Sequence, residues 1–260
     1  MVGVLCFAVP MFLQIQDKNQ QQAVISTYQQ SVMKCDESDL KECFEKAVEY
    51  NRQLFELKGV SVGDSVALDY ESQLNVTQTG MMGHLQIPEI DVKLPIYHGT
   101  SDEVLATSIG HLEGTSLPVG GENSHAVLTG HCGLPNAELF TRLDELKMND
   151  EFFLQVCNQT MAYQVVEIQV VEPEQVDAIV IEDGRDLVSL ITCTPYGINT
   201  HRLIVTGERL KDVEDVEQLM LETENKGGVN EKIYYIVGAC FVFCIWSASQ
   251  SIRRKHRYNS

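Results

Sequence analysis

The sequence predicts a mainly β protein, a closed barrel or sandwich, with α-helices before it and a transmembrane helix after it. Three patterns indicate this architecture. After Gly80 the chain divides into short apolar runs separated by turn residues, which is typical of barrels and sandwiches. Before Gly80, apolar residues recur at helical spacing, and near the C-terminus an apolar stretch is followed by a basic tail.

Residues 1–14 form an apolar segment that carries no charge between Val2 and Leu13. A helix of that length reaches only about 18 Å, short of the ~30 Å hydrocarbon core of a bilayer. No basic residues precede it, as they do in a complete signal peptide. We interpret the segment as the remainder of a signal anchor that begins upstream of Met1, with a short buried helix as the alternative.

Residues 15–80 are predicted to hold a helical region and the segment that leads into the sheet. The chain from Asp17 to Leu57 is expected to be helical, with Asp36 or Ser38 capping a helix start and Gly59 ending it. One apolar face of this region recurs at intervals of three and four residues: Leu40, Cys43, Phe44, Ala47, Val48, Leu54 and Phe55. We expect these helices to pack on the outside of the barrel.

Residues 81–212 are predicted to form the barrel, because β-rich runs and turn signals alternate there. The expected strands are His84–Ile87, Val92–Ile96, Ala126–Thr129, Phe152–Val156, Tyr163–Val170, Leu187–Thr192 and Leu203–Val205. Between them, Leu139–Leu146 is expected to form a short helix.

The C-terminal part divides into an acidic linker (213–232), a transmembrane helix (233–252) and a basic tail (253–260). The span from Ile233 to Ile252 is long enough to cross a bilayer, at about twenty residues. Because basic residues stay on the cytoplasmic side, the tail is expected in the cytoplasm and the barrel outside. A buried soluble hairpin is the alternative.

A possible nucleophile lies at Cys193, where the apolar run Leu187–Thr192 ends. A short loop with Pro, Gly and Asn follows, and a second β-rich run starts after Arg202. Two runs joined in this way predict neighbouring antiparallel strands, with Cys193 and Arg202 within reach of each other. A guanidinium favours the thiolate form of a nearby cysteine and donates hydrogen bonds to an oxyanion. The alternative is a structural cysteine and an arginine that only begins a strand.

The motif Ala126-Val-Leu-Thr-Gly-His-Cys-Gly-Leu-Pro135 supplies a histidine. His131 lies between Gly130 and Gly133, where the backbone can turn and expose the ring. A cysteine with a histidine distant in sequence is the arrangement of a cysteine nucleophile and its acid/base partner.

Several motifs together resemble the sortases, specifically the class C, pilus-polymerising ones. Ser189-Leu-Ile-Thr-Cys193 followed by an arginine nine residues later resembles the sortase signature, and Leu128-Thr-Gly-His-Cys-Gly-Leu-Pro135 resembles the histidine motif. Further matching segments are Ile87–Ile90, Leu94–Thr100, Gly110–Gly121 and Leu139–Leu143. The resemblance covers Gly83 to Leu210, about half of the chain.

The resemblance implies an eight-stranded sortase-type barrel and a cysteine transpeptidase at the surface of a Gram-positive cell. It implies that Cys193 attacks the Thr–Gly bond of an LPXTG-like sorting signal, that His131 is the acid/base and that Arg202 stabilises the oxyanion. The implied acceptor is a lysine amine of a second pilin. Two positions depart from the family: Ser189 replaces the usual threonine, and the segment Leu57–Val66 lacks the Asp-Pro-aromatic motif of many class C lids.

Other classes of site are disfavoured. The net charge of −18 argues against nucleic-acid binding. No metal site and no cofactor are predicted, since the adjacent residues His131 and Cys132 are poorly placed to share one zinc ion. His98 and His111 are expected to make structural hydrogen bonds, and His201 to point away from Arg202. Cys132 is expected to point into the core.

Alternative functions remain open. The catalytic motif alone does not distinguish a pilin polymerase from a sortase that anchors surface proteins to a cell-wall precursor. A membrane-anchored module that binds peptide without turnover is the alternative from a different class. Cys35 and Cys43 are expected to be unpaired, half-buried thiols rather than a disulfide.

Overall fold

The structure is a computed structural model, and it describes residues 2–57, 69–134, 137–211, 216 and 218–223. Two helices come first, α1 (Val2–Val32) and α2 (Glu37–Glu56). The eight strands are β1 (Met81–Ile87), β2 (Val92–His98), β3 (Ile109–His111), β4 (Ser124–Thr129), β5 (Glu151–Val156), β6 (Gln159–Val171), β7 (Asp186–Thr194) and β8 (His201–Arg209). Short helical turns interrupt them at η1 (Pro88–Ile90), α3 (Asp102–Leu105), η2 (Leu143–Glu145) and η3 (Val176–Ile179).

The strands close into a barrel in the order β1-β2-β3-β4-β7-β8-β6-β5, which confirms the predicted eight-stranded barrel. The pairs β2–β3 and β4–β7 are parallel, and the other pairs are antiparallel. All seven strands expected from the sequence are present. The eighth, β3, has only three residues including a glycine, too few to show a periodic pattern.

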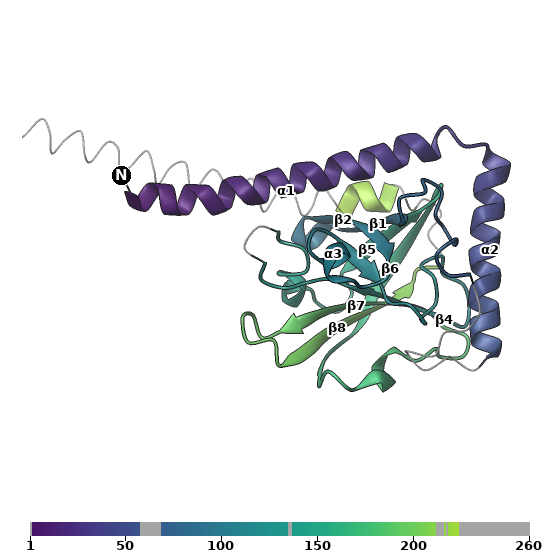
Figure 1. Cartoon of the computed structure of the whole chain (residues 1–260). Coiled ribbons are helices and arrows are strands. Elements are labelled where there is room, and N and C mark those ends of the chain that lie inside the picture. The colour runs from purple at the N-terminus through teal and green to yellow at the C-terminus, as the bar shows by residue number, and fades with distance from the viewer. Residues whose placement is uncertain (1, 58–68, 135–136, 212–215, 217, 224–260) are drawn as a thin grey trace, which may run out of the picture.

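The helices pack outside the barrel, as expected. In Figure 1, α1 lies across the top of the barrel and α2 descends along its right-hand side. The Tyr28 hydroxyl of α1 donates to the carbonyl oxygen of Met82 on β1 at 3.0 Å. Asn51 of α2 is buried and exchanges hydrogen bonds with the backbone of Leu117, at 3.0 Å to the carbonyl and 2.6 Å from the amide.

Details of the helices differ from the prediction. The helical region divides after Val32, and α2 begins after Asp36, which is the N-cap residue as predicted but makes no side-chain capping bond. On α2 the predicted apolar face is buried at Leu40, Ala47 and Leu54, but Val48 is 41% exposed. The expected helix over Leu139–Leu146 is reduced to η2, because Leu139 adopts a φ of 39° that no right-handed helix accommodates.

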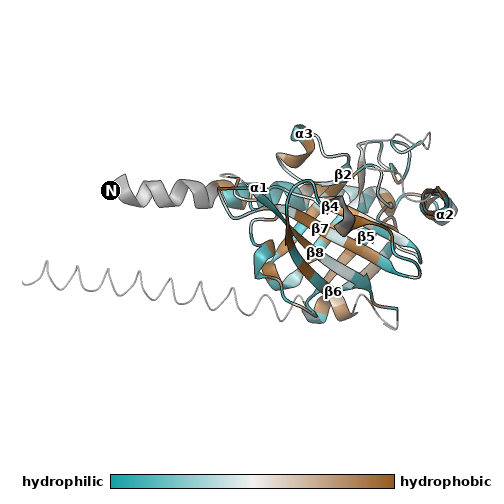
Figure 2. Ribbon diagram, turned by 90° about the horizontal axis from the view of Figure 1, so that it is seen from below, coloured by the Kyte–Doolittle hydropathy of each residue, from teal (hydrophilic) through white to brown (hydrophobic). Residues whose placement is uncertain are grey.

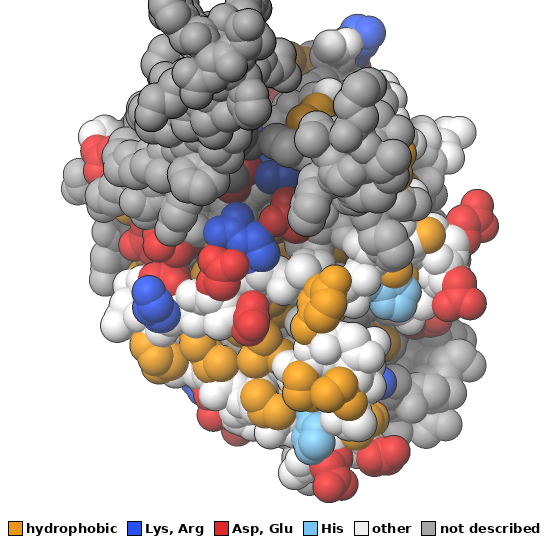
Figure 3. Space-filling view, turned by 90° about the vertical axis from the view of Figure 1, so that its left-hand side faces the viewer, with side chains coloured by type: hydrophobic (Ala, Val, Ile, Leu, Met, Phe, Trp, Pro, Cys, Tyr) orange, Lys and Arg blue, Asp and Glu red, His pale blue; other side chains and the backbone are white. Residues whose placement is uncertain are grey.

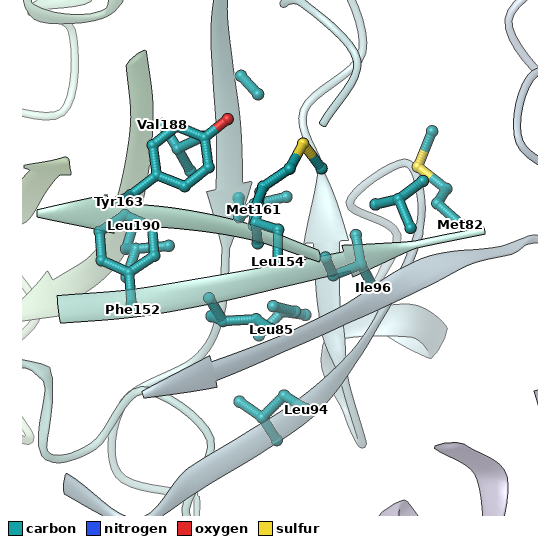
Figure 4. Close-up of a cluster of buried hydrophobic side chains, with 14 of the residues drawn as sticks. Met82, Leu85, Leu94, Ile96, Phe152, Leu154, Met161, Tyr163, Val188 and Leu190 are labelled. Atoms are coloured by element: carbon teal, nitrogen blue, oxygen red, sulfur yellow. The ribbon is translucent and has the colours of Figure 1, made fainter. Parts of the chain in front are cut away.

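The core fills the barrel interior. Figure 4 shows side chains of Leu85, Ile96, Phe152, Tyr163 and Val188 converging from different strands. The rings of Phe152 and Tyr163 stack at 5.5 Å between centroids. Figure 2 shows hydrophobic and hydrophilic segments mixed along the strands, with α2 seen end-on beside them, as expected when side chains alternate between two faces.

In the described ranges, no helix has the length and hydropathy needed to cross a bilayer. The predicted transmembrane helix (233–252) and basic tail (253–260) lie outside those ranges, as does most of the linker. Gly59 and the segment that corresponds to a lid, residues 58–68, also lie outside them. The division of the chain into these segments stays a prediction.

Candidate active site

Strands β7 and β8 form an antiparallel pair in which Cys193 is the direct partner of Arg202. The predicted neighbouring strands are thereby confirmed. The loop between them closes with the amides of Ile198 and Asn199 both donating to the Pro195 carbonyl at 3.0 Å. Asn199 at a φ of 61° completes the turn, which suits an asparagine.

Strands β4 and β7 run parallel, and their register brings His131 to the level of Cys193. The last paired residues are Thr129 and Ile191. Two further hydrogen bonds extend this register past the end of β4: the Gly130 amide donates to the Ile191 carbonyl at 3.1 Å, and the Thr192 hydroxyl donates to the Gly130 carbonyl at 2.8 Å. Cys193 therefore lies between His131 on one side and Arg202 on the other.

Strand alternation sets the face on which these residues lie. Val188 and Leu190 belong to the buried core cluster, so Ser189, Ile191 and Cys193 project from the outer face of the barrel wall. Arg202 shares that face because it is paired with Cys193. His201 pairs with Thr194 and projects to the other face, as predicted.

The three candidate residues are all half-buried, so each is held by its surroundings and still open to a substrate. The Arg202 guanidinium is held by backbone carbonyls of its own hairpin, His201 at 3.1 Å and Asn199 at 3.5 Å. Carbonyl partners leave its positive charge uncompensated, and other guanidinium N–H groups can donate to an oxyanion.

Exposed apolar residues of the β7–β8 loop form a rim beside the site. Tyr196 and Ile198, in the loop after Cys193, are 67% and 68% exposed. The Tyr196 ring packs against Gly133, where an added Cβ would come within 2.9 Å of it. Figure 3 looks onto this end of the molecule, where hydrophobic side chains gather with histidines beside them. Such a rim suits an apolar peptide better than a charged one.

Three other cysteines among the described residues, Cys132, Cys35 and Cys43, are free thiols. Cys132 is half-buried and does not belong to the core cluster, so the expectation that it points into the core is wrong. Burial raises the pKa of its thiol, and the nearby Asp144 and Cys193 side chains raise it further. Cys35 and Cys43 are free and half-buried, as predicted.

Two of the other histidines, His98 and His111, make structural hydrogen bonds. His98 bonds to the carbonyls of Gly80 and Gln73, both at 2.8 Å, and His111 bonds to Tyr70 at 2.9 Å and to the Ser116 carbonyl at 2.8 Å. These bonds confirm the prediction for both residues.

Two features of the site have no counterpart in the sequence analysis. They are the Thr192–Gly130 bond and a buried network around His125 and Ser189. Hydroxyl and imidazole groups inside a β-rich run give no sequence signal of the partners they find across the sheet.

Comparison with known proteins agrees with this geometry. A family model described as "Sortase domain" matches residues 85–210. The crystal structure of sortase C1 from Streptococcus agalactiae is 47% identical, with a TM-score of 0.71, over 74% of this chain and 100% of that one. The structure of sortase C from Streptococcus pneumoniae is 41% identical, with a TM-score of 0.68, over 75% of this chain and 100% of that one.

Among curated relatives, sortase D of Bacillus subtilis is 30% identical over 49% of this chain. That match spans 63% of the length of sortase D. A second match, to sortase A from Streptococcus agalactiae, spans 55% of the length of that protein. The strand order, the register of the site and the similarity to two solved structures all point to the same family. The chain belongs to the sortase family of cysteine transpeptidases.

Proposed function

We propose that this protein cleaves an LPXTG-like sorting signal between Thr and Gly and transfers the acyl group to a lysine amine of a pilin. The observation that carries the proposal is the register that sets His131, Cys193 and Arg202 side by side at one end of the barrel. Cysteine, histidine and arginine have no need to coincide in this way for peptide binding alone.

In the first step the Cys193 sulfur attacks the threonine carbonyl carbon, and the C–N bond to glycine breaks. His131 protonates the leaving amine, while Arg202 donates hydrogen bonds to the oxyanion of the tetrahedral intermediate. In the second step a lysine amine attacks the thioester and loses its proton to His131. An isopeptide bond forms and the cysteine is released as thiolate.

The likeness to sortase C structures supports a pilin acceptor. The Streptococcus pneumoniae sortase C structure is described as giving insight into pilin substrate specificity. The apolar rim at Tyr196 and Ile198 is compatible with the Leu-Pro part of a sorting signal. A sortase that transfers proteins to a cell-wall precursor would use the same residues, and only the amine acceptor separates the two functions.

We infer a location at the cell membrane with the barrel outside, from the apolar N-terminal segment and the apolar stretch before the basic tail. The partners are then LPXTG-bearing pilin subunits, a second pilin that offers the lysine, and the membrane itself. No cofactor enters the proposed reaction, because the thiol, the imidazole and the guanidinium supply every step.

The test is to mix the protein with a sorting-signal peptide and a candidate pilin domain and to read the products by mass spectrometry. The expected product is a covalent pilin–peptide conjugate that is absent with Cys193→Ala. Cleavage with water or hydroxylamine as the only effective acceptor keeps the cysteine mechanism but contradicts the pilin assignment. If hydroxylamine traps no acyl group, the protein is a binding module and the proposal is wrong.

A further inference from the structure

The outer face that carries Cys193 and Arg202 continues away from the site and is covered there. On this face His125, Val127 and Ser189 are at most 2% exposed, and Thr206 is 5% exposed. Val127 does not belong to the core cluster inside the barrel, and the strand register places Ser189 and Thr206 on the same face as Val127. Something outside the barrel therefore covers them.

The cover is the β6–β7 connection, residues 172–185, which Figure 1 shows running below β7 and β8. It begins beside the site, because Val171 at the end of β6 is paired with Arg202. It ends far from the site, where the Ser124 amide donates to the Arg185 carbonyl at 3.2 Å and Arg185 pairs with Glu208 at 2.9 Å. The connection thus runs along the whole face from Arg202 to the start of β7.

One imidazole ties the middle of this connection to the wall of the barrel. His125 Nδ1 lies 2.8 Å from the Val180 carbonyl, and His125 Nε2 lies 2.8 Å from the Ser189 hydroxyl. Ser189 in turn lies 2.8 Å from the Thr206 hydroxyl. The network joins β4, β7 and β8, the three strands that position the candidate catalytic residues, to the β6–β7 connection.

The donors and acceptors of this network match throughout. A carbonyl only accepts, so Nδ1 donates to Val180 and the neutral ring accepts at Nε2 from the Ser189 hydroxyl. The single Ser189 proton is then used, and the Thr206 hydroxyl donates to Ser189. Burial lowers the pKa of His125, which keeps the ring in the neutral form that this arrangement needs.

We propose that His125 is a positioning residue that holds the β6–β7 connection against the outer face, and so sets the surface that a sorting-signal peptide meets beside Arg202 as it approaches Cys193. The proposal rests on the proposed function for the identity of the peptide. It also gives a role to Ser189, the residue that departs from the family's usual threonine. Ser189 orients the His125 ring across the boundary between two strands.

The test compares His125→Leu, which removes both ring nitrogens, with His125→Asn, whose amide keeps a donor near Nδ1. In His125→Leu, the KM for a sorting-signal peptide is expected to rise about fivefold to tenfold, the effect of one lost buried hydrogen bond. The kcat and the rate at which iodoacetamide modifies the Cys193 peptide stay within about twofold, because the site itself is not altered. His125→Asn is expected to recover most of the KM.

Two measurements without turnover keep the proposal separate from the proposed function. They are the hydrogen exchange of residues 172–181 and the Kd of a labelled peptide for the Cys193→Ala protein with and without His125→Leu. Faster exchange together with a weaker Kd supports the proposal even if no pilin conjugate ever forms. Unchanged exchange, or faster exchange with an unchanged Kd, overturns it.

If His125→Leu does not fold, Ser189→Ala with Ser189→Thr as its control replaces it. Both serine variants are buried at the same position, and only threonine keeps the hydroxyl that orients the ring. A rise in KM with alanine but not with threonine supports the proposal. Equal effects of the two variants overturn it, because packing and not the hydroxyl would then matter.

Discussion

Cys193 on β7 is the direct cross-strand partner of Arg202 on β8. In an antiparallel pair, side chains of directly opposite residues lie on the same face with their Cβ atoms about 4.5–5.5 Å apart. The backbone ladder itself therefore fixes the thiol beside the guanidinium. The Arg202 head is further held by the His201 and Asn199 carbonyls of the same hairpin, so its position needs no substrate to form.

Arg202→Ala is expected to lower kcat/KM for the sorting-signal peptide by roughly 100-fold to 1,000-fold, the usual cost of one lost oxyanion donor. Arg202→Lys should recover only part of the loss, because an ammonium lacks the forked donors of a guanidinium. The neighbouring His201→Ala, on the opposite face, is the control and should leave kcat/KM within about twofold. Equal losses at positions 201 and 202 would show that the hairpin, not the guanidinium, was damaged.

Thr192 is expected to support catalysis through His131. Its buried hydroxyl donates to the Gly130 carbonyl at 2.8 Å and so holds the residue that precedes His131. Thr192→Val leaves that carbonyl without its donor at nearly constant volume, which should lower the free energy of unfolding by about 1 kcal/mol. The kcat should fall more than KM rises, and Thr192→Ser should restore it. A valine variant with normal kcat in a steady-state assay would contradict this role.

The hairpin of the site could be predicted from the sequence because it is local. Cys193 and Arg202 are nine positions apart, and one tight loop brings their strands together. The position of His131 beside Cys193 could not be predicted in the same way. It depends on the parallel register between β4 and β7, which lie about sixty residues apart in the sequence. The family motif supplied that link where strand patterns could not.

Other parts of the fold escaped prediction for identifiable reasons. Leu139 adopts a positive φ, which cannot be predicted from a leucine. The apolar stretch expected to be helical therefore forms only the short turn η2. Val48 is spaced along α2 like the residues of its apolar face, but it lies at the edge of that face and is exposed. His125 and Ser189 meet only because parallel strands and a distant connection converge on them.

Stability is expected to fall as the pH falls below about 6.5, because buried histidines must then take up a proton on unfolding. Burial lowers the pKa of His111 to about 4, partly offset by its bond to the Ser116 carbonyl. A depressed folded pKa contributes stability that is present above the unfolded value of about 6.5 and is lost as the pH approaches the folded value. For His111 alone the loss by pH 5 is about 2 kcal/mol.

Urea unfolding at pH 7.5, 6.0 and 5.0 measures this loss. The comparison is between the wild type and His111→Gln, which cannot titrate but can still donate to the Ser116 carbonyl. The wild type should lose about 2 kcal/mol more than the variant over this range. Parallel curves for the wild type and His111→Gln would contradict the assignment.

Cys43 on α2 is expected to react as a thiolate near neutral pH. A hydrogen bond from the Cys157 thiol, followed by the backbone amide of Leu74, lowers the pKa of Cys43 to about 7 against the opposing effect of burial. The same contact raises the pKa of Cys157. Because access limits the absolute rate of a half-buried thiol, the informative quantity is the pH midpoint of its reaction with iodoacetamide.

Mass spectrometry of the peptide that contains Cys43 should give a midpoint near 7. In Cys157→Ala the donor is lost, and the midpoint should move up toward the ordinary thiol value of about 8.5. A midpoint that does not move in Cys157→Ala would mean that the amide of Leu74, and not the neighbouring thiol, sets the acidity of Cys43.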